Sequence, residues 1–201
     1  SKVLIMGDNE GASGSNDYRM GSPVFPEQYA AGCELQVQDI NAAIRGAFSA
    51  GATEVDVIDG HGGGGNIKPE RVDTRASLLG GAMALFERVF SGQIAEYDAM
   101  ILVGQHAQAG TRDGYLSHTN TGSTCLRLNG QGVGEIEELA WLVGDKGVRT
   151  VMVSGDDAVC REARALLPGV RTAAVKTATS RLQVTCLPPP EAHALIETTA
   201  T

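Results

Sequence analysis

Two carboxylates stand one residue apart just after a short apolar run near the start of the chain. Val3 to Met6 is typical of a buried strand, the run stops at Gly7, and Asp8 and Glu10 follow in GDNEGASG. Because residues i and i+2 leave a strand on the same side, both carboxylates can point toward one space. Two adjacent carboxylates repel, and one must hold a proton unless a cation lies between them. The spacing therefore indicates a cation site.

Three of the four histidines lie in the same kind of position as this pair. His61 follows a predicted strand over 54–58, and His106 follows another over 99–103. His118 lies in a later polar loop, DGYLSHTNTG. In an open α/β sheet, sites form beyond the carboxyl ends of the strands. We therefore expect these imidazoles to lie near the carboxylate pair.

A fifth candidate ligand is Glu135, which follows Gly134 at the exit of a predicted hairpin. Zinc accepts imidazole nitrogen and carboxylate oxygen together, in sites of four or five ligands. Two imidazoles and three carboxylates are more ligands than one such zinc site needs. This number suits two metals that share one carboxylate. Paired metals of this kind serve aminopeptidases, phosphatases and nucleases. The predicted ligands are Asp8, Glu10, His61, His106 and Glu135.

Each of these pieces also has an interpretation without a metal. The Asp8 to Glu10 stretch could be a turn and helix cap, and Glu135 could favour a helix N-terminus. The loop GHGGGGN could cradle a phosphate, although it lacks a G-x-G-x-x-G pattern and a Walker lysine. Asp156 and Asp157 are most simply a helix N-cap pair. No nucleophile elbow and no Cys-His pair is evident.

The elements that must position these residues alternate between strands and helices. Asn129-Gly130 between two short runs predicts a hairpin. The β-α-β order predicts an α/β/α sandwich, with a largely parallel sheet flanked by helices and one antiparallel hairpin. The predicted strands span 3–6, 54–58, 99–103, 149–155, 170–176 and 182–187, and the helices 27–50, 82–90, 135–145, 157–167 and the segment after 188.

Composition excludes several classes of protein. The chain has 201 residues, enough for one domain with a core, and a formal net charge of −8, which argues against nucleic acid and an anionic membrane surface as partners. Its four cysteines show no CxxC spacing, and we expect reduced, mostly buried thiols. No apolar run approaches the roughly 18 residues of a membrane span, and no signal peptide is visible, so we expect a cytoplasmic protein.

The motifs together resemble the binuclear zinc D-aminopeptidase family. GDNEGASG is similar to the family's opening, S-x-D-x-E-G-x-S-G, and the resemblance runs from about Val3 to the last residue. The sequence departs from the family most clearly after Ser13-Gly14, in a stretch that bears on substrate choice. The further matching blocks, in the family's order, are EVDVIDGHG, AMILVGQHAQAGTRDGYLSHT, LNGQGVGEIEELA, VMVSGDDAVCREA and TAAVKTATSR.

The resemblance implies a role for each matching residue. It implies two Zn²⁺ per chain held by the five predicted ligands, with Asp8 as the bridge and Asp59 as a supporting partner of His61. His118 matches a family histidine that stands near the metals without binding them. It would be the catalytic residue that assists proton transfer or stabilises the oxyanion.

The implied activity is hydrolysis of the amide bond of short peptides or aminoacyl amides with a free N-terminus, including D-amino acid peptides. The family forms ring-shaped homo-oligomers and carries a further C-terminal region. We therefore expect a catalytic domain over 1–187, with 188–201 starting a helix that leads toward that region. The alternatives are a metallo-amidase for a non-peptide amide and a non-catalytic α/β binding module, with a phosphate-binding enzyme ranked last.

Overall fold

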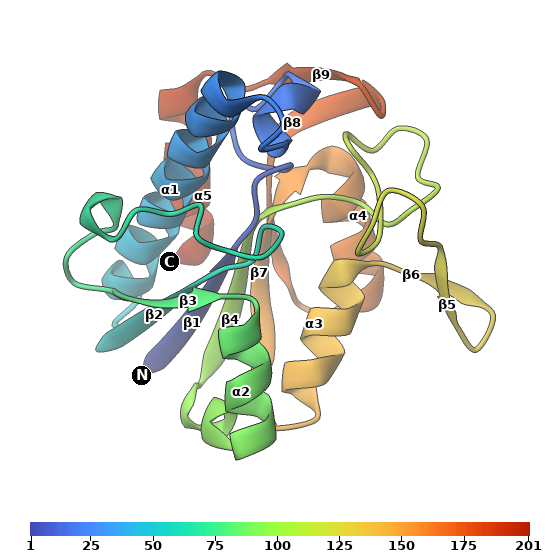
Figure 1. Ribbon diagram of the computed structural model, residues 1–201. Coiled ribbons are helices and arrows are strands. Elements are labelled where there is room, and N and C mark those ends of the chain that lie inside the picture. The colour runs from blue at the N-terminus through green and yellow to red at the C-terminus, as the bar shows by residue number, and fades with distance from the viewer.

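A sheet of seven strands with helices on both faces organises the computed structural model, which describes residues 1–201 (Figure 1). The strands are β1 (Lys2–Gly7), β2 (Glu54–Asp59), β3 (Ser77–Gly81), β4 (Ala99–Gln105), β7 (Arg149–Asp156), β8 (Arg171–Ser180) and β9 (Gln183–Cys186). Their order is β3-β2-β1-β4-β7-β8-β9, and all neighbours are parallel except β8 and β9. The predicted fold class is confirmed. The helices are α1 (Pro26–Ser49), α2 (Met83–Ser91), α3 (Glu135–Gly144), α4 (Asp157–Leu166) and α5 (Pro189–Ala200).

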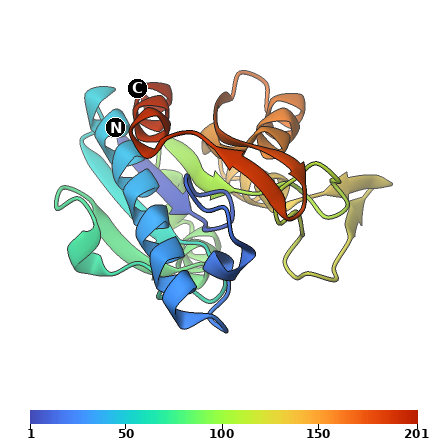
Figure 2. The same ribbon diagram turned by 90° about the horizontal axis from the view of Figure 1, so that it is seen from above.

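The two faces of the sheet hold two separate apolar cores. In β1, Val3 and Ile5 join the core under α1 and α5, whereas Leu4 and Met6 join the core under α2, α3 and α4. Side chains alternate across a strand, so a strand covered on both faces must be apolar at every position. Seen from above, α1 and α5 lie side by side on one face (Figure 2). The continuous apolar run before Gly7 therefore marks a central strand.

The predicted hairpin forms, but it stands outside the main sheet. β5 (Leu126–Leu128) and β6 (Gln131–Val133) pair only with each other and project from the body of the molecule (Figure 1). Asn129 and Gly130 both have positive φ, at 51° and 84°, as a two-residue primed turn requires. The antiparallel pair within the main sheet is instead β8–β9.

Two expectations need correction. The edge strand β3 was not predicted, because its sequence offers only two leucines before a Gly-Gly pair. The four cysteines are free, but only Cys160 is buried, and Cys125 is exposed, so the expectation of mostly buried thiols is wrong. No helix has the length and apolar character needed to cross a bilayer.

The topology decides where the functional residues meet. β1 and β4 are neighbours, yet the chain leaves them toward opposite halves of the sheet, which creates a crevice beyond their carboxyl ends. Gly7, the last residue of β1, pairs with Val103 in β4 and with Asp59 in β2. The segments that follow these three strands therefore emerge beside one another.

A glycine in α1 sets how closely α5 can pack. A Cβ added at Gly46 would lie 2.4 Å from the carbonyl oxygen of Glu197 and 2.6 Å from the Cβ of Ala200. We predict that Gly46→Ala lowers the free energy of unfolding by about 1–3 kcal/mol, because α5 must shift. Gly144→Ala is the control, because nothing lies within 4 Å of its added Cβ. Urea denaturation measures both, and equal stability of the two variants would contradict the close helix contact.

Candidate metal centre

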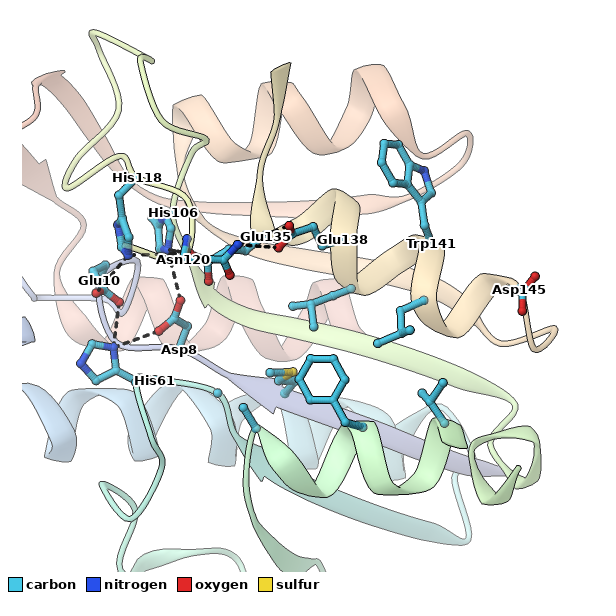
Figure 3. Close-up of a pocket in the computed structure, with 18 of the residues that line it drawn as sticks. Asp8, Glu10, His61, His106, His118, Asn120, Glu135, Glu138, Trp141 and Asp145 are labelled. Carbon is cyan, nitrogen blue, oxygen red and sulfur yellow. Dashed lines mark hydrogen bonds and ion pairs between the residues drawn. The ribbon is translucent and has the colours of Figure 1, made fainter. Parts of the chain in front are cut away.

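Six of the residues predicted from the sequence line one cavity of about 1070 Å³ at the carboxyl ends of β1, β2 and β4 (Figure 3). They come from the three loops that follow β1, β2 and β4 and from the first turn of α3, which are far apart in the sequence. Three carboxylates and three imidazoles thus share one space. The residues are Asp8, Glu10, His61, His106, His118 and Glu135.

Asp8 stands between two of the histidines. Its Oδ1 lies 3.1 Å from Nδ1 of His61, and its Oδ2 lies 3.5 Å from Nε2 of His106. Glu10 Oε2 lies 3.0 Å from the same His61 nitrogen, and Glu135 Oε1 lies 3.4 Å from the same His106 nitrogen. The carboxylate of Asp8 is therefore shared by two halves of the cluster, each with one further carboxylate and one imidazole.

Each imidazole is oriented by a backbone carbonyl on the side away from the cluster. His61 donates from Nε2 to the carbonyl of Gly21 at 3.1 Å, and His106 donates from Nδ1 to that of Ala107 at 3.1 Å. His118 donates from Nδ1 to the carbonyl of Leu116 at 2.7 Å. A carbonyl can only accept, so these bonds fix which nitrogen carries a proton. The other nitrogen of every ring faces the carboxylates.

His118 lies against His106 rather than apart from the cluster. The two rings stack with centroids 3.8 Å apart, and Nε2 of His118 lies 3.7 Å from Oε1 of Glu135. Leu116, whose carbonyl orients the ring, has a φ of 49°, which is uncommon for a leucine. Its amide donates to the carbonyl of Arg181 at 2.9 Å, which holds this turn in place.

The charges of the cluster shift its pKa values strongly. Burial and the charge of Glu10 raise the pKa of Asp8, whereas for Glu10 the hydrogen bond and charge of His61 outweigh burial and lower its pKa. Burial opposes protonation of the imidazoles, but the carboxylates outweigh it and raise the pKa of His61 to about 12 and of His106 to about 10. Burial likewise opposes ionisation of Glu135, but His106 lowers its pKa. The site favours positive charge at its centre.

Two glycines let the first loop approach the end of β4. The amide of Asp8 donates to Val103 and that of Gly11 to Gly104, both at 2.8 Å. A Cβ at Gly11 would lie 1.9 Å from the carbonyl oxygen of Gln105, and one at Gly104 would lie 2.2 Å from that of Asp8. Gly104 also has a φ of 71°. Larger residues would push Asp8 away from His106.

Asp59 supports its loop rather than the ring of His61. Its Oδ2 accepts from the amides of Asn66 and Ile67 at 2.6 and 3.2 Å, and Asn66 in turn donates to the carbonyl of His61 at 2.7 Å. The partner of the His61 ring on the outer side is Gly21. Asp59 therefore fixes the end of the Gly-rich loop through the amides of Asn66 and Ile67.

Lys176 is a residue of the site that sequence reasoning missed. It lies on β8, is 2% exposed, and donates from Nζ to the carbonyls of Glu10 at 2.8 Å and Ser15 at 2.7 Å. Burial lowers its pKa to about 8. Its ammonium group also lies 4.7 Å from the ring centre of Tyr115. A lysine within the small and apolar run AAVKTA was the available signal.

The donor set fits a divalent metal. Nε2 of His106 is buried and lacks a hydrogen-bond partner, although two carboxylate oxygens face it. Ligand atoms of Asp8, Glu10 and His106 lie within 4.8 Å of one another, as do those of His106, His118 and Glu135. An imidazole whose second nitrogen donates to a carbonyl is the usual arrangement of a metal-binding histidine.

Comparisons with known proteins find similarity along the whole chain. The family model described as D-aminopeptidase matches residues 1–201. A D-aminopeptidase of Bacillus subtilis (strain 168) is 35% identical over 196 residues, which are 97% of this chain and 70% of that protein. The solved structure of the Zn-dependent D-aminopeptidase DppA from Bacillus subtilis, described as a self-compartmentalizing protease, matches with a TM-score of 0.90 and 31% identity, over 100% of this chain and 72% of that one.

We predict that Lys176→Met weakens metal binding. The change removes the donor of two buried carbonyls and frees the loop that carries Asp8 and Glu10. We expect about a 10- to 100-fold loss of affinity for Zn²⁺ by calorimetry, and a free energy of unfolding lower by about 1–3 kcal/mol. Lys68→Met, at an exposed lysine, is the control. Equal affinity in the two variants would show that Lys176 does not position the loop.

Proposed function

The chain belongs to the D-aminopeptidase family, and on that premise we propose that it is a zinc-dependent aminopeptidase. Its substrates are short peptides and aminoacyl amides with a free N-terminal amine, D-amino acid peptides among them, and it hydrolyses the amide bond after the first residue. The observation that carries the proposal is the convergence of three carboxylates and three carbonyl-oriented imidazoles on one cavity.

We assign two Zn²⁺ to the two halves of the cluster. Both halves share the carboxylate of Asp8, which faces a histidine in each of them. One half also contains Glu10 and His61. The other half also contains His106 and Glu135. When bound, such a metal pair lowers the pKa of a water ligand and polarises the scissile carbonyl. These side chains would hold that pair between them, and the metals would offset the charges of the three carboxylates.

We assign to His118 the role of general acid or base in the reaction. Its Nδ1 is tied to Leu116, so Nε2 is the atom that can take up and release a proton beside the cluster. Nε2 lies 4.0 Å from Glu10 and 3.7 Å from Glu135, close to the reacting region. Stacking on His106 prevents the ring from turning away. A general acid or base must lie within reach of its proton, and this placement satisfies that condition.

We predict that metal removal abolishes hydrolysis and that a free amine is required. Protein treated with a chelator should release no amine from L- or D-alanyl amides, and added Zn²⁺ should restore the activity. N-acetyl-alanyl amide should remain intact, because it lacks the α-amine. Chromogenic versions of these amides measure the hydrolysis rate after chelation, after zinc is restored, and with the acetylated substrate. Cleavage of the acetylated amide at an equal rate would favour the amidase alternative, and no cleavage of any amide by the zinc-loaded protein would refute the proposal.

We predict that His118→Gln lowers kcat about 10²- to 10⁴-fold while the protein keeps its zinc. Steady-state kinetics and elemental analysis of the same sample separate proton transfer from metal binding. His193→Gln, on α5 outside the cavity, is the matched control and should keep normal kinetics. If His118→Gln loses zinc together with activity, His118 is a ligand and the assignment of its role is wrong.

A further inference from the structure

The cavity continues well beyond the metal cluster as a groove between α2 and α3. Figure 3 shows it running from Asp8 and Glu135 toward Asp145. The floor is the side chain of Met6 on β1, and the walls are apolar residues of the two helices. These wall residues are Phe86, Val89, Phe90, Leu139, Trp141 and Leu142.

One face of α3 joins the cluster to the groove. Glu135, Leu139 and Leu142 recur at helical spacing, so they share a face, and Asp145 follows on the same side. From Glu135 to Asp145 the helix rises about 15 Å at 1.5 Å per residue. That length matches roughly four residues of an extended peptide. A molecule bound at the cluster can therefore continue along the helix without leaving the cavity.

The groove exposes large apolar side chains to solvent. Phe90 is 83% exposed and Trp141 is 41% exposed. A contiguous apolar patch of this kind generally marks a binding surface. At the far end, Lys146 is paired with Asp145 at 2.8 Å, so no unpaired cation is present there to hold a terminal carboxylate. Between the cluster and this ion pair, the residues of α2 and α3 that line the groove are mainly apolar.

We propose that this groove binds the large apolar side chains of a peptide substrate, and that the substrate class is peptides of about three to five residues rich in such side chains. The proposal rests on the proposed function, because it places the substrate's amine at the cluster. The groove and the cluster are parts of one cavity, so the residues beyond the scissile bond enter the groove directly. A second copy of this chain is the competing occupant.

Trp141 allows a binding test that needs no catalysis, because it is the single tryptophan of the chain. Zinc-free protein is titrated with alanyl-leucyl-leucine and with alanyl-seryl-serine, each made with D- and with L-alanine. We expect a saturable blue shift of tryptophan emission with the leucyl peptide. We expect its Kd to be at least about tenfold lower than that of the seryl peptide.

Two variants test the walls of the groove. Leu139→Ala and Leu142→Ala should each raise the Kd of the leucyl peptide about fivefold or more. In the zinc-loaded protein they should also raise KM for that peptide. Leu182→Ala, at an exposed leucine in the turn between β8 and β9, is the matched control. Circular dichroism confirms that each variant is folded.

The outcomes separate the groove from the proposed function. Equal Kd values for the two peptides, or no emission change, would overturn the groove proposal even where alanyl amides are hydrolysed. Emission that shifts with protein concentration, together with growth in mass by light scattering, would overturn it in favour of a second copy in the groove. A peptide-dependent shift in a protein that hydrolyses no amide would support the groove and refute the aminopeptidase proposal.

Discussion

The mutual repulsion of three carboxylates in one largely buried space is the constraint on which this structure depends. Asp8, Glu10 and Glu135 cannot all be ionised side by side unless positive charge lies among them. Two neighbouring imidazoles have strongly raised pKa values for the same reason. Backbone carbonyls orient the rings so that their free nitrogens face inward. The cluster therefore has the charge and the donor atoms that suit a divalent cation.

The backbone makes this arrangement possible. The crevice between β1 and β4 supplies the space, and the contact of Gly11 with Gly104 brings the first loop against the end of β4. Lys176 on β8 then holds that loop through the carbonyls of Glu10 and Ser15. Apolar packing on both faces of β1 fixes the strand that leads into the loop. The arrangement of the cluster thus depends on contacts among four strands rather than on one local motif.

Part of this could be predicted from sequence because it depends on local patterns. Buried strands followed at once by polar residues identified the carboxyl ends of β1, β2 and β4, and with them Asp8, His61 and His106. The partner of His61 could not be predicted, because Gly21 reaches the ring only through the folding of the first loop. Lys176 escaped notice because its contacts span about 160 residues of sequence. The edge strand β3 escaped because glycines occupy positions that apolar residues fill in central strands.

The most direct test of the central claim is the zinc content of the protein purified without chelators, measured by elemental mass spectrometry beside that of Asp8→Ala. We predict about two zinc ions per chain in the unsubstituted protein. We predict that the binding of both ions is weakened or lost in the variant, because Asp8 faces both halves of the cluster. A folded protein without tightly bound metal, or a variant that retains both ions, would contradict that claim.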